Sequence, residues 1–381
     1  MIYLDANATT RISRAARAAL LAVVDGGPHN PSSAHRSGSH ARSLLERARQ
    51  DVADALGGCD PDNVFFTSGG TEGNNLAIRG FSANPSSFVF RSAVEHASVS
   101  GPAEATGRSA ILRVEADGIV DVASAAAALR RPDFDGIPIL VCVQAANSET
   151  GIVQPVGEIA ARLREIREFL YLHVDAAQAL GRTPLSLDGV DSLSFSGHKL
   201  HAPTGTGFLY LSDRMLEAVR PILHGGGQEG GVRPGTQNVA GACALAAALA
   251  DRMEHLAGHA ELLRALRDRL EAGVTRSVPG ASVIGATACR IPNTANIMFP
   301  GQDAQALLAR LDAEGVCCST GSACSSARPE ASPVLKSMGM SEREASSCLR
   351  FSVSVDNTPD EIDEAVRAIV RCAADGLRMQ G

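Results

Sequence analysis

The sequence predicts an α/β fold with a mostly parallel central sheet, followed by a smaller C-terminal α/β domain. Short apolar runs alternate along the chain with stretches of helical periodicity, and each apolar run ends in polar residues. This alternation is typical of parallel sheets, whose strand carboxyl ends form a ligand-binding edge. With 381 residues, 45% of them hydrophobic, the chain is long enough for a large domain and a smaller companion.

Bulk properties exclude several classes of function. The net charge is −7 and no block of like charges occurs, so we expect no direct binding to nucleic acid or to an anionic membrane. No apolar run could span a bilayer, and residues 1–5 do not resemble a signal peptide. Nine cysteines without a Cys-x-x-Cys pair argue against a disulfide framework or a metal site and favour a reducing cytoplasm.

The elements before residue 211 follow from apolar patterning. Runs of three to five apolar residues predict strands, and apolar residues at helical spacing, as between Ala41 and Leu56, predict helices. The expected order is a strand at 2–4, helices at 14–24 and 41–56, strands at 64–66, 88–90 and 139–143, a helix at 159–169, and strands at 170–174 and 193–195.

A glycine-rich turn follows strand 64–66. The turn is Thr67-Ser68-Gly69-Gly70-Thr71, and a helix continues through residues 76–78. This arrangement points backbone N–H groups and the positive end of the helix dipole at one place, where they can hold a phosphate. Many such turns bind nothing, so the turn alone is a weak signal.

A lysine and an acid follow neighbouring strands. Asp175 comes directly after strand 170–174, and Lys199 follows strand 193–195 within Ser196-Gly197-His198-Lys199. A lysine amine can form a Schiff base with an aldehyde, and a carboxylate can keep a pyridine nitrogen protonated. These are the two requirements of a pyridoxal phosphate (PLP) site. His96, after strand 88–90, is expected at the same edge, where a histidine suits ring stacking or proton transfer.

The pattern changes after Leu211. Residues 225–236 form a polar, glycine-rich loop, and 242–270 predict a long helix that Gly258 is expected to kink. We place the domain boundary in this helix, with a large domain at 13–250 and a small domain at 251–381. The N-terminal segment 1–12 is expected to pack near the small domain.

Ten motifs in this order resemble the cysteine desulfurases of the NifS/IscS type, within the class V aminotransferase family. The resemblance covers nearly the whole chain and implies PLP fold type I. The motifs are residues 5–10, 30–35, 67–75, 95–96, 147–151, 173–178, 196–199, 233–236, 321–324 and Arg350.

The resemblance also implies residue roles. Lys199 would carry PLP, Asp175 would pair with its ring nitrogen, Gln178 would bind its ring hydroxyl, and His96 would stack on the ring and move protons. Gly70, Thr71, Ser196 and His198 would bind the phosphate, Thr236 would bind the phosphate of the other subunit of a homodimer, and Arg350 would clamp the substrate carboxylate.

One position departs from the family pattern. Family members commonly have Asn-Asn-Glu where this chain has Asn147-Ser148-Glu149. The second asparagine, which contacts the ring hydroxyl, aligns with Ser148. Either Ser148 makes this contact through a shifted backbone, or Asn147 takes it over together with a substrate contact.

Cys324 determines the chemistry that the resemblance implies. Its thiolate would attack the sulfur of L-cysteine bound to PLP, leaving an enzyme persulfide and L-alanine. Small residues surround it, so we expect a mobile, exposed loop at about 318–333 that passes the sulfur to an acceptor protein. Cys317 and Cys318 read as strand residues without an assigned role.

Three alternatives remain at this stage. The chain could be another PLP enzyme of this fold, such as a selenocysteine lyase or an aminotransferase. It could be a sulfur-carrier or iron–sulfur scaffold protein that does not use PLP. A nucleic-acid-modifying module is disfavoured by the acidic charge. The destination of the sulfur, whether iron–sulfur clusters, tRNA or DNA, is not specified by these motifs.

Overall fold

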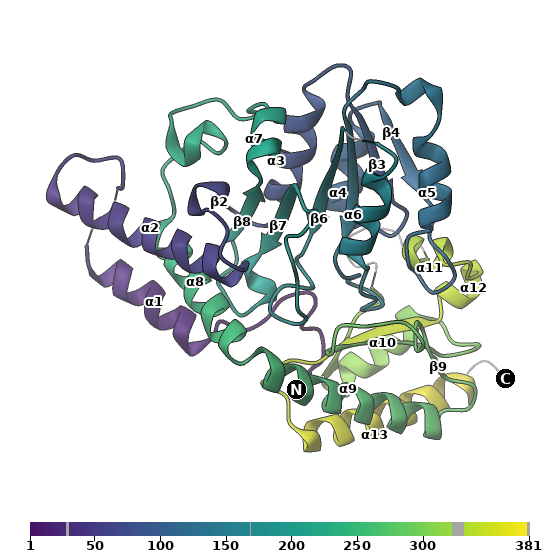
Figure 1. Ribbon diagram of the computed structural model, residues 1–381. Helices are drawn as coiled ribbons and strands as arrows, with labels where there is room; N and C mark the ends of the chain where they lie inside the picture. The colour runs from purple at the N-terminus through teal and green to yellow at the C-terminus, as the bar shows by residue number, and fades with distance from the viewer. Residues whose placement is uncertain (28–29, 168, 322–330, 379–381) are drawn as a thin grey trace.

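The structure is a computed structural model that describes residues 1–27, 30–167, 169–321 and 331–378 (Figure 1). Cys324 and most of the loop expected at 318–333 lie outside the described residues.

A seven-stranded sheet forms the centre of the larger part of the chain. Its order is β2 (Val64–Thr67), β8 (Gly207–Leu211), β7 (Ser192–Ser196), β6 (Leu170–Asp175), β5 (Ile139–Gln144), β3 (Phe88–Ser92) and β4 (Ser109–Leu112). Of these described strands, β8 alone is antiparallel to its neighbours. The predicted α/β class with a mostly parallel sheet is therefore confirmed.

Helices cover both faces of this sheet because its strands are apolar on both sides. In β5, Leu140 and Cys142 pack in one cluster with helices α3 (Gly70–Ser82), α4 (Ala97–Glu104) and α7 (Asp213–Ala218). Ile139, Val141 and Val143 pack in another cluster, with α5 (Val122–Leu129), α6 (Val156–Arg164) and α8 (Val239–Glu254). Alternate residues of a strand point to opposite faces, so each face receives its own core.

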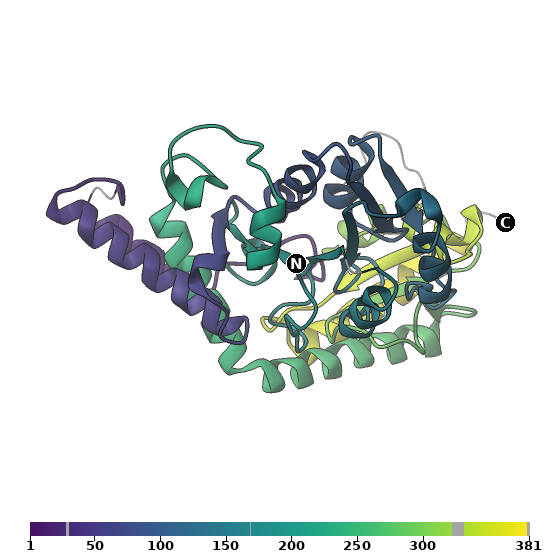
Figure 2. The ribbon, with the colours of Figure 1, turned by 45° about the horizontal axis from the view of Figure 1, so that its top comes forward.

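Two further helices pack on α8 at the edge of the molecule. They are α1 (Arg14–Asp25) and α2 (Arg36–Ala55), which lie beside α8 in Figures 1 and 2. The Ser13 side chain caps α1, and the His35 side chain caps α2 by accepting a hydrogen bond from Gly38 N. Short 3₁₀ turns, η1 (Pro61–Asn63) and η2 (Pro132–Phe134), precede β2 and β5.

The long helix expected at 242–270 is broken, but not at Gly258. The break is at His255 (φ −108°, ψ 15°), between α8 and α9 (Leu256–Ser277). The His255 ring donates a hydrogen bond from Nδ1 to the Asp251 carbonyl oxygen. Gly258 lies inside the first turn of α9, so the expected kink site is wrong by three residues. The helix expected to run to residue 169 also ends earlier, at Arg164, because the chain turns there to enter β6.

The remaining elements form a smaller body with its own core. A three-stranded antiparallel sheet has the order β12 (Cys348–Ser352), β10 (Thr294–Met298), β9 (Ser282–Val283), and β1 (Ile2–Tyr3) pairs in parallel with β11 (Val316–Cys317). Helices α10 (Ala304–Ala313) and α13 (Pro359–Arg378) pack in this core, whereas α11 (Pro333–Ser337) and α12 (Glu342–Ala345) pack in a separate cluster with Val94 and Ile152 of the larger part. Helices α9 and α13 lie side by side along its outer surface (Figure 1). The boundary between residues 250 and 251 stays a prediction; it falls inside α8.

Candidate active site

Five strand ends bring the predicted cofactor residues to one edge of the central sheet. Strands β2, β7, β6, β5 and β3 run in the same direction, so their carboxyl ends face the same way. Just beyond these ends lie Gly70 and Thr71 after β2, Ser196, His198 and Lys199 at β7, Asp175 and Gln178 at β6, Asn147 and Ser148 after β5, and His96 after β3.

Lys199 ends the short 3₁₀ turn η3 (Gly197–Lys199), which directly follows β7. Its Nζ donates to the carbonyl oxygens of Asn7 (2.7 Å) and Ala8 (2.8 Å), so the amine is held beside the N-terminal segment. Arg182 Nη2 donates to the Lys199 carbonyl oxygen at 2.9 Å. Both the amine and the backbone of this lysine are therefore fixed in place.

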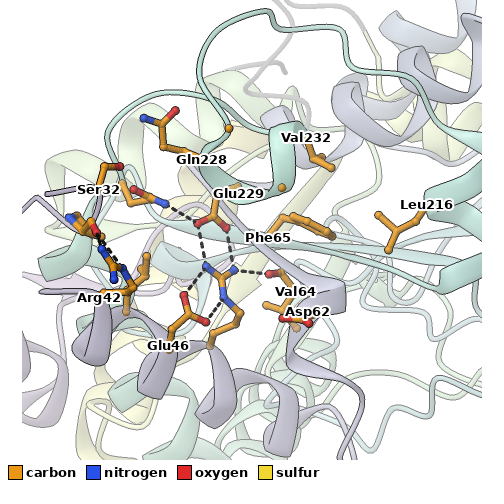
Figure 3. Close-up of a pocket in the computed structure, with 16 residues that line it drawn as sticks. Ser32, Arg42, Glu46, Asp62, Val64, Phe65, Leu216, Gln228, Glu229 and Val232 are labelled. Carbon is orange, nitrogen blue, oxygen red and sulfur yellow. Dashed lines mark hydrogen bonds and ion pairs between the residues drawn. The ribbon is translucent and has the colours of Figure 1, made fainter. Parts of the chain in front are cut away.

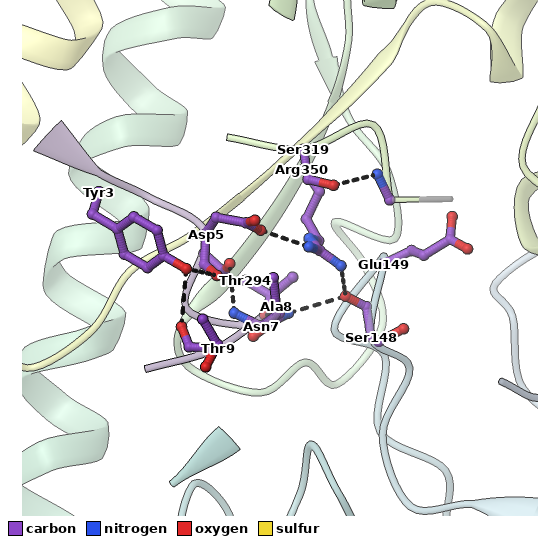
Figure 4. Close-up of polar contacts among 12 residues, drawn as sticks. Tyr3, Asp5, Asn7, Ala8, Thr9, Ser148, Glu149, Thr294, Ser319 and Arg350 are labelled. Carbon is purple, nitrogen blue, oxygen red and sulfur yellow. Dashed lines mark hydrogen bonds and ion pairs between the residues drawn. The ribbon is translucent and has the colours of Figure 1, made fainter. Parts of the chain in front are cut away.

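Asn7 connects the two bodies of the molecule. It is 1% exposed, and its Nδ2 donates to Ser148 O (3.0 Å) and to Thr294 Oγ1 (2.9 Å) (Figure 4). Its carbonyl oxygen accepts from Gln178 Nε2 (3.1 Å) as well as from Lys199. The sequence motif around Asn7 pointed to the family, but its role as this link was not predicted.

A hydrogen-bond chain runs from Asp175 to His96. Asn74 Nδ2 donates to Asp175 Oδ2 (2.9 Å) and to Ser98 Oγ (2.8 Å), and Ser98 Oγ lies 2.7 Å from His96 Nδ1. Because Ser98 N also donates to Nδ1, this nitrogen acts as the acceptor, and the proton of a neutral His96 ring is on Nε2. Asn74 is fully buried, and its role in this chain was not predicted. Its position in the glycine-rich motif was the sequence signal that could have indicated a role.

His173 supports the same chain from inside the sheet. It lies on β6, fully buried, with Nε2 2.8 Å from Asn74 Oδ1 and Nδ1 2.8 Å from Ser192 Oγ. Burial lowers the pKa of His173 to about 4, although the nearby Asp175 carboxylate opposes this shift. The ring is therefore neutral near pH 7 and orients the Asn74 amide.

The glycine-rich turn has the expected form. Helix α3 starts at Gly70, after Gly69, whose positive φ (153°) is a backbone conformation that favours glycine. A side chain at Gly69 or Gly70 would contact Ser196, at 3.5 and 3.6 Å from the added Cβ, so Ser196 lies next to the helix start. The first N–H groups of a helix have no partner within it and suit an anion.

His198, in η3, is half-buried. Its Nδ1 lies 3.1 Å from Thr9 Oγ1, and its carbonyl oxygen accepts from Thr10 N and Thr10 Oγ1. Burial, and next the Lys199 charge, lower the pKa of His198 to about 4. A neutral His198 can therefore offer one hydrogen bond to a ligand but no positive charge.

Asn147 and Ser148 have different surroundings. Asn147 Oδ1 accepts from Glu149 N (2.8 Å), Thr150 N (2.9 Å) and Thr150 Oγ1 (3.1 Å), and its Nδ2 donates to Val94 O (3.2 Å). That side chain is used to shape its own turn. The Ser148 carbonyl oxygen accepts from Asn7 and Arg350, while its hydroxyl makes no hydrogen bond within the part of the chain that the structure describes.

Arg350 lies on β12, 5% exposed, and faces the central sheet across the gap that Asn7 bridges. Its Nη2 donates to Asp5 Oδ1 (2.6 Å) and its Nη1 to Ser148 O (3.1 Å) (Figure 4). The Nε atom is buried without a hydrogen-bond partner among the described residues. Such an orphaned donor is unusual in a protein interior and is available to a ligand.

Glu95 is a second buried acid at the same sheet edge. Its Oε1 accepts from Ser92 Oγ (2.5 Å) and Gln144 N (2.8 Å), whereas Oε2 is buried without a partner among the described residues. Burial raises the pKa of Glu95 to about 8. It therefore holds its proton near pH 7. The sequence motif Glu95-His96 was noted, but the burial of the Glu95 side chain was not predicted.

Thr236 lies apart from these contacts. It is exposed, in the loop between η4 (Gln228–Gly231) and α8. The loop is anchored by Glu229, whose carboxylate pairs with Arg49 (2.8 and 2.9 Å) and accepts from Phe66 N (2.8 Å) (Figure 3). A cavity of about 820 Å³ opens beside this ion pair, and none of the predicted catalytic residues lines it.

Three of the described cysteines are unsuited to attack as thiolates, because they are shielded from water. Burial raises the pKa of Cys318, of Cys142 and of Cys348, the last to about 12.

No group of three or more His, Cys, Asp or Glu side chains in the described ranges could hold a metal ion. Among the described helices, none has the length and apolarity needed to cross a membrane.

Comparison with known proteins identifies the family of this chain. Residues 2–365 match the family described as aminotransferase class-V, and the chain belongs to that family. Cysteine desulfurase 2 of Trichormus variabilis is 39% identical over 375 residues, 96% of this chain and 92% of that protein. The cysteine desulfurase NifS of Azotobacter vinelandii is 37% identical over 376 residues, 97% of this chain and 91% of its own.

A solved structure shows the same fold. The NifS-like protein of Rickettsia africae superposes with a TM-score of 0.88 at 32% identity, covering 98% of this chain and 99% of that one. The predicted resemblance and the assignment to an enzyme family are therefore confirmed, whereas the roles of individual residues remain predictions.

Proposed function

We propose that this protein is a PLP-dependent cysteine desulfurase, which converts L-cysteine to L-alanine and retains the sulfur as a persulfide on Cys324. The observation that carries the proposal is the placement of the Lys199 amine and the Asp175 carboxylate at neighbouring strand ends of one sheet edge. The relatives named as cysteine desulfurases cover almost the whole chain, which supports the reaction class.

The residues at this edge fit PLP. The sequence contains two lysines, and the other, Lys336, is exposed on α11, so Lys199 is the one available to the aldehyde. The start of α3, with Ser196 beside it, suits the phosphate. Asp175 would pair with the ring nitrogen. When bound, PLP supplies an electron sink that weakens bonds at the substrate's carbons.

The chain's own residues would orient the substrate and move its protons. The orphaned Arg350 Nε and its neighbouring Nη atoms would bind the L-cysteine carboxylate in a fork that a lysine could not reproduce. His96, with its proton on Nε2 and its Nδ1 fixed by Ser98, would exchange a proton with the substrate.

Ser148 is our choice for the contact with the ring hydroxyl. The Asn147 side chain already makes four hydrogen bonds, three within its own turn and one to Val94 O, and turning it toward the cofactor would break them. The hydroxyl of Ser148 is the group left for this task, with Gln178 on the neighbouring strand end.

The sulfur step balances without an external oxidant. The Cys324 thiolate forms an S–S bond to the substrate sulfur while the substrate's Cβ–S bond breaks. The electron pair of that bond stays on carbon, which takes up a proton to give L-alanine. The substrate carbon is reduced and the sulfur is oxidised to the sulfane level, so an acceptor protein can later receive it.

The assembly we propose is a cytoplasmic homodimer, with the exposed Thr236 at the phosphate of the other subunit. The buried Arg49–Glu229 pair, which fixes the Thr236 loop, supports this role. Iron–sulfur cluster assembly, tRNA thiolation and DNA phosphorothioation are all possible destinations of the sulfur, which a pull-down of the acceptor protein would identify.

The test is a single turnover of the PLP-loaded enzyme with ³⁵S-labelled L-cysteine. Wild-type protein should release L-alanine without a keto-acid acceptor and carry the label on Cys324, located by peptide mapping. Cys324→Ser should bind L-cysteine, as its change in visible absorbance shows, but form almost no alanine. Cys318→Ser serves as the matched control and should retain the label on Cys324.

Two results would contradict the proposal. Full alanine formation by Cys324→Ser would indicate a lyase without an enzyme persulfide, as in a selenocysteine lyase. Transfer of the cysteine amino group to an added keto acid, with the sulfur still on the cysteine carbon, would indicate an aminotransferase.

A further inference from the structure

Glu149 is a buried carboxylate that the proposed chemistry does not use. It is 7% exposed, in the turn that follows β5. Its backbone is fixed on both sides, because its N–H donates to Asn147 Oδ1 (2.8 Å) and its carbonyl oxygen accepts from Asn296 Nδ2 (3.3 Å). Placing such a group in the interior is costly, so its contacts need an explanation.

One oxygen of Glu149 contacts both described ends of the segment that contains Cys324. Ser332 Oγ donates to Glu149 Oε2 at 2.5 Å. Gly321 packs against the same oxygen so closely that a Cβ at this position would lie 2.8 Å from it. Residues 322–330, outside the described residues, connect Gly321 to Ala331 and Ser332.

Each of these two ends is tied in turn to a regular element. Ser332 caps helix α11 by accepting from Leu335 N (3.2 Å). Gly321 N donates to Ser319 Oγ (3.1 Å), and Ser319 exchanges two backbone hydrogen bonds with Arg350, at 2.7 and 3.1 Å. The strand residue that we assign to the substrate carboxylate therefore also holds the start of the cysteine segment.

Arg350 and Glu149 are also neighbours through Ser148. The Ser148 carbonyl oxygen accepts from Arg350 Nη1, and Glu149 is the next residue (Figure 4). Burial raises the pKa of Glu149, and its bond from Ser332 and the charge of Arg350 both oppose that rise. The carboxylate thus lies between Arg350, which we assign to the substrate carboxylate, and the two described ends of the segment that contains Cys324.

We infer that Glu149 is a positioning residue that holds Gly321 and Ser332, the two described ends of the segment that contains Cys324, relative to Arg350, and that the sulfur step depends on this hold. The inference deepens the proposed function and rests on it. Misplacing a reacting group by about 1 Å can cost about 100-fold in rate, so one buried side chain that holds two ends has a large influence on the sulfur step.

The experiment compares Glu149→Ala, Glu149→Gln and Ser332→Ala in the PLP-loaded enzyme, with Glu158→Ala, an exposed glutamate on α6, as the control. Three quantities are measured: the Kd for L-cysteine from visible absorbance, the single-turnover rate of persulfide formation on Cys324, and hydrogen–deuterium exchange of residues 331–338. The exchange measurement needs neither substrate nor turnover.

We expect Glu149→Ala to slow persulfide formation by about 10- to 100-fold while the Kd for L-cysteine changes less than about threefold. Amide exchange at the start of α11 should rise by about tenfold, because the Ser332 cap loses its partner. Glu149→Gln keeps an acceptor for Ser332 and should restore most of the rate. Ser332→Ala, which frees one end, should fall between the two.

Three outcomes would overturn the inference. Persulfide formation by Glu149→Ala at the wild-type rate would show that the contacts do not position the thiol. A Kd that rises as much as the rate falls would place the effect on Arg350 alone. Equal loss of PLP, cysteine binding and exchange protection throughout the protein would show a general folding role. Failure of the wild-type enzyme to form a persulfide would instead contradict the proposed function.

Discussion

The two sides of the candidate site are built in different ways. The cofactor side takes Ser196, Lys199, Asp175 and His96 from strand ends of one parallel sheet. The thiol side joins Asp5, Ser148, Ser319, Ser332 and Arg350, which come from distant parts of the chain. Strand order alone gathers the first set, whereas the second depends on individual long-range contacts.

This difference gives a rule for separating the roles of the two sides. Changes on the cofactor side should remove PLP or its chemistry, whereas changes on the thiol side should leave PLP in place and affect substrate binding or sulfur transfer. Three variants can break or sharpen this separation.

Lys199→Ala should have the largest effect. Without the amine, no PLP should be fixed by borohydride reduction and no alanine should form, while the protein stays folded. The carbonyl oxygens of Asn7 and Ala8 lose the Lys199 donor, although Asn7 keeps the one from Gln178, so we expect the free energy of unfolding to fall by about 1–3 kcal/mol. Mass mapping of the reduced protein checks the site.

Lys336→Ala is the matched control, since it removes the other lysine of the sequence. This variant should keep both borohydride-fixed PLP and alanine formation. Reduction that labels Lys336 in the wild-type protein would refute the assignment of Lys199.

Arg350→Lys tests the thiol side. It keeps the charge but loses the fork that binds a carboxylate, and a charged hydrogen bond contributes about 1.5–3 kcal/mol. The Kd for L-cysteine should therefore rise by about 10- to 100-fold, measured by absorbance titration, with unchanged PLP content. Arg371→Lys, at an exposed pair on α13, should leave the Kd unaltered. Loss of PLP in step with the weaker binding would mean that the two sides are not separable.

Glu95→Gln should have the smallest effect on the chemistry, and its effect on stability should depend on pH. Burial raises the pKa of Glu95 from its ordinary 4.5 to about 8, so the unfolded chain loses this proton at lower pH than the folded protein does. The wild-type free energy of unfolding should therefore fall, relative to the variant, as the pH rises from about 4.5 to about 8, by up to about 1.4 kcal/mol per pH unit.

Urea unfolding of both proteins at pH 5, 6.5 and 8 measures this difference. A stability difference that does not change with pH would mean that Glu95 is ionised in the folded protein. Glu95 would then be a charged member of the cofactor side, and not the neutral one that its burial indicates.

The same contrast explains what the sequence could predict. Apolar runs located the strands, and residues after them, such as Asp175 and Lys199, were placed at one edge by the parallel topology. Asn7, Asn74 and Glu149 were not assigned roles, because a buried polar side chain has a meaning only through its partners. The kink predicted at Gly258 was misplaced for a related reason. A glycine permits a kink, but the packing of α9 on the smaller body determines that the long helix breaks at His255.

The ion pair between Asp5 and Arg350 has a consequence for how the protein is made. The two residues are 345 positions apart. At a synthesis rate of about 5–20 residues per second, the ribosome needs roughly 17 to 70 s to add Arg350 after Asp5. During that interval the central sheet can assemble, while the segment around Asn7, which holds the Lys199 amine, still lacks its partners on β10 and β12. The site can therefore close only after Arg350 has been synthesised.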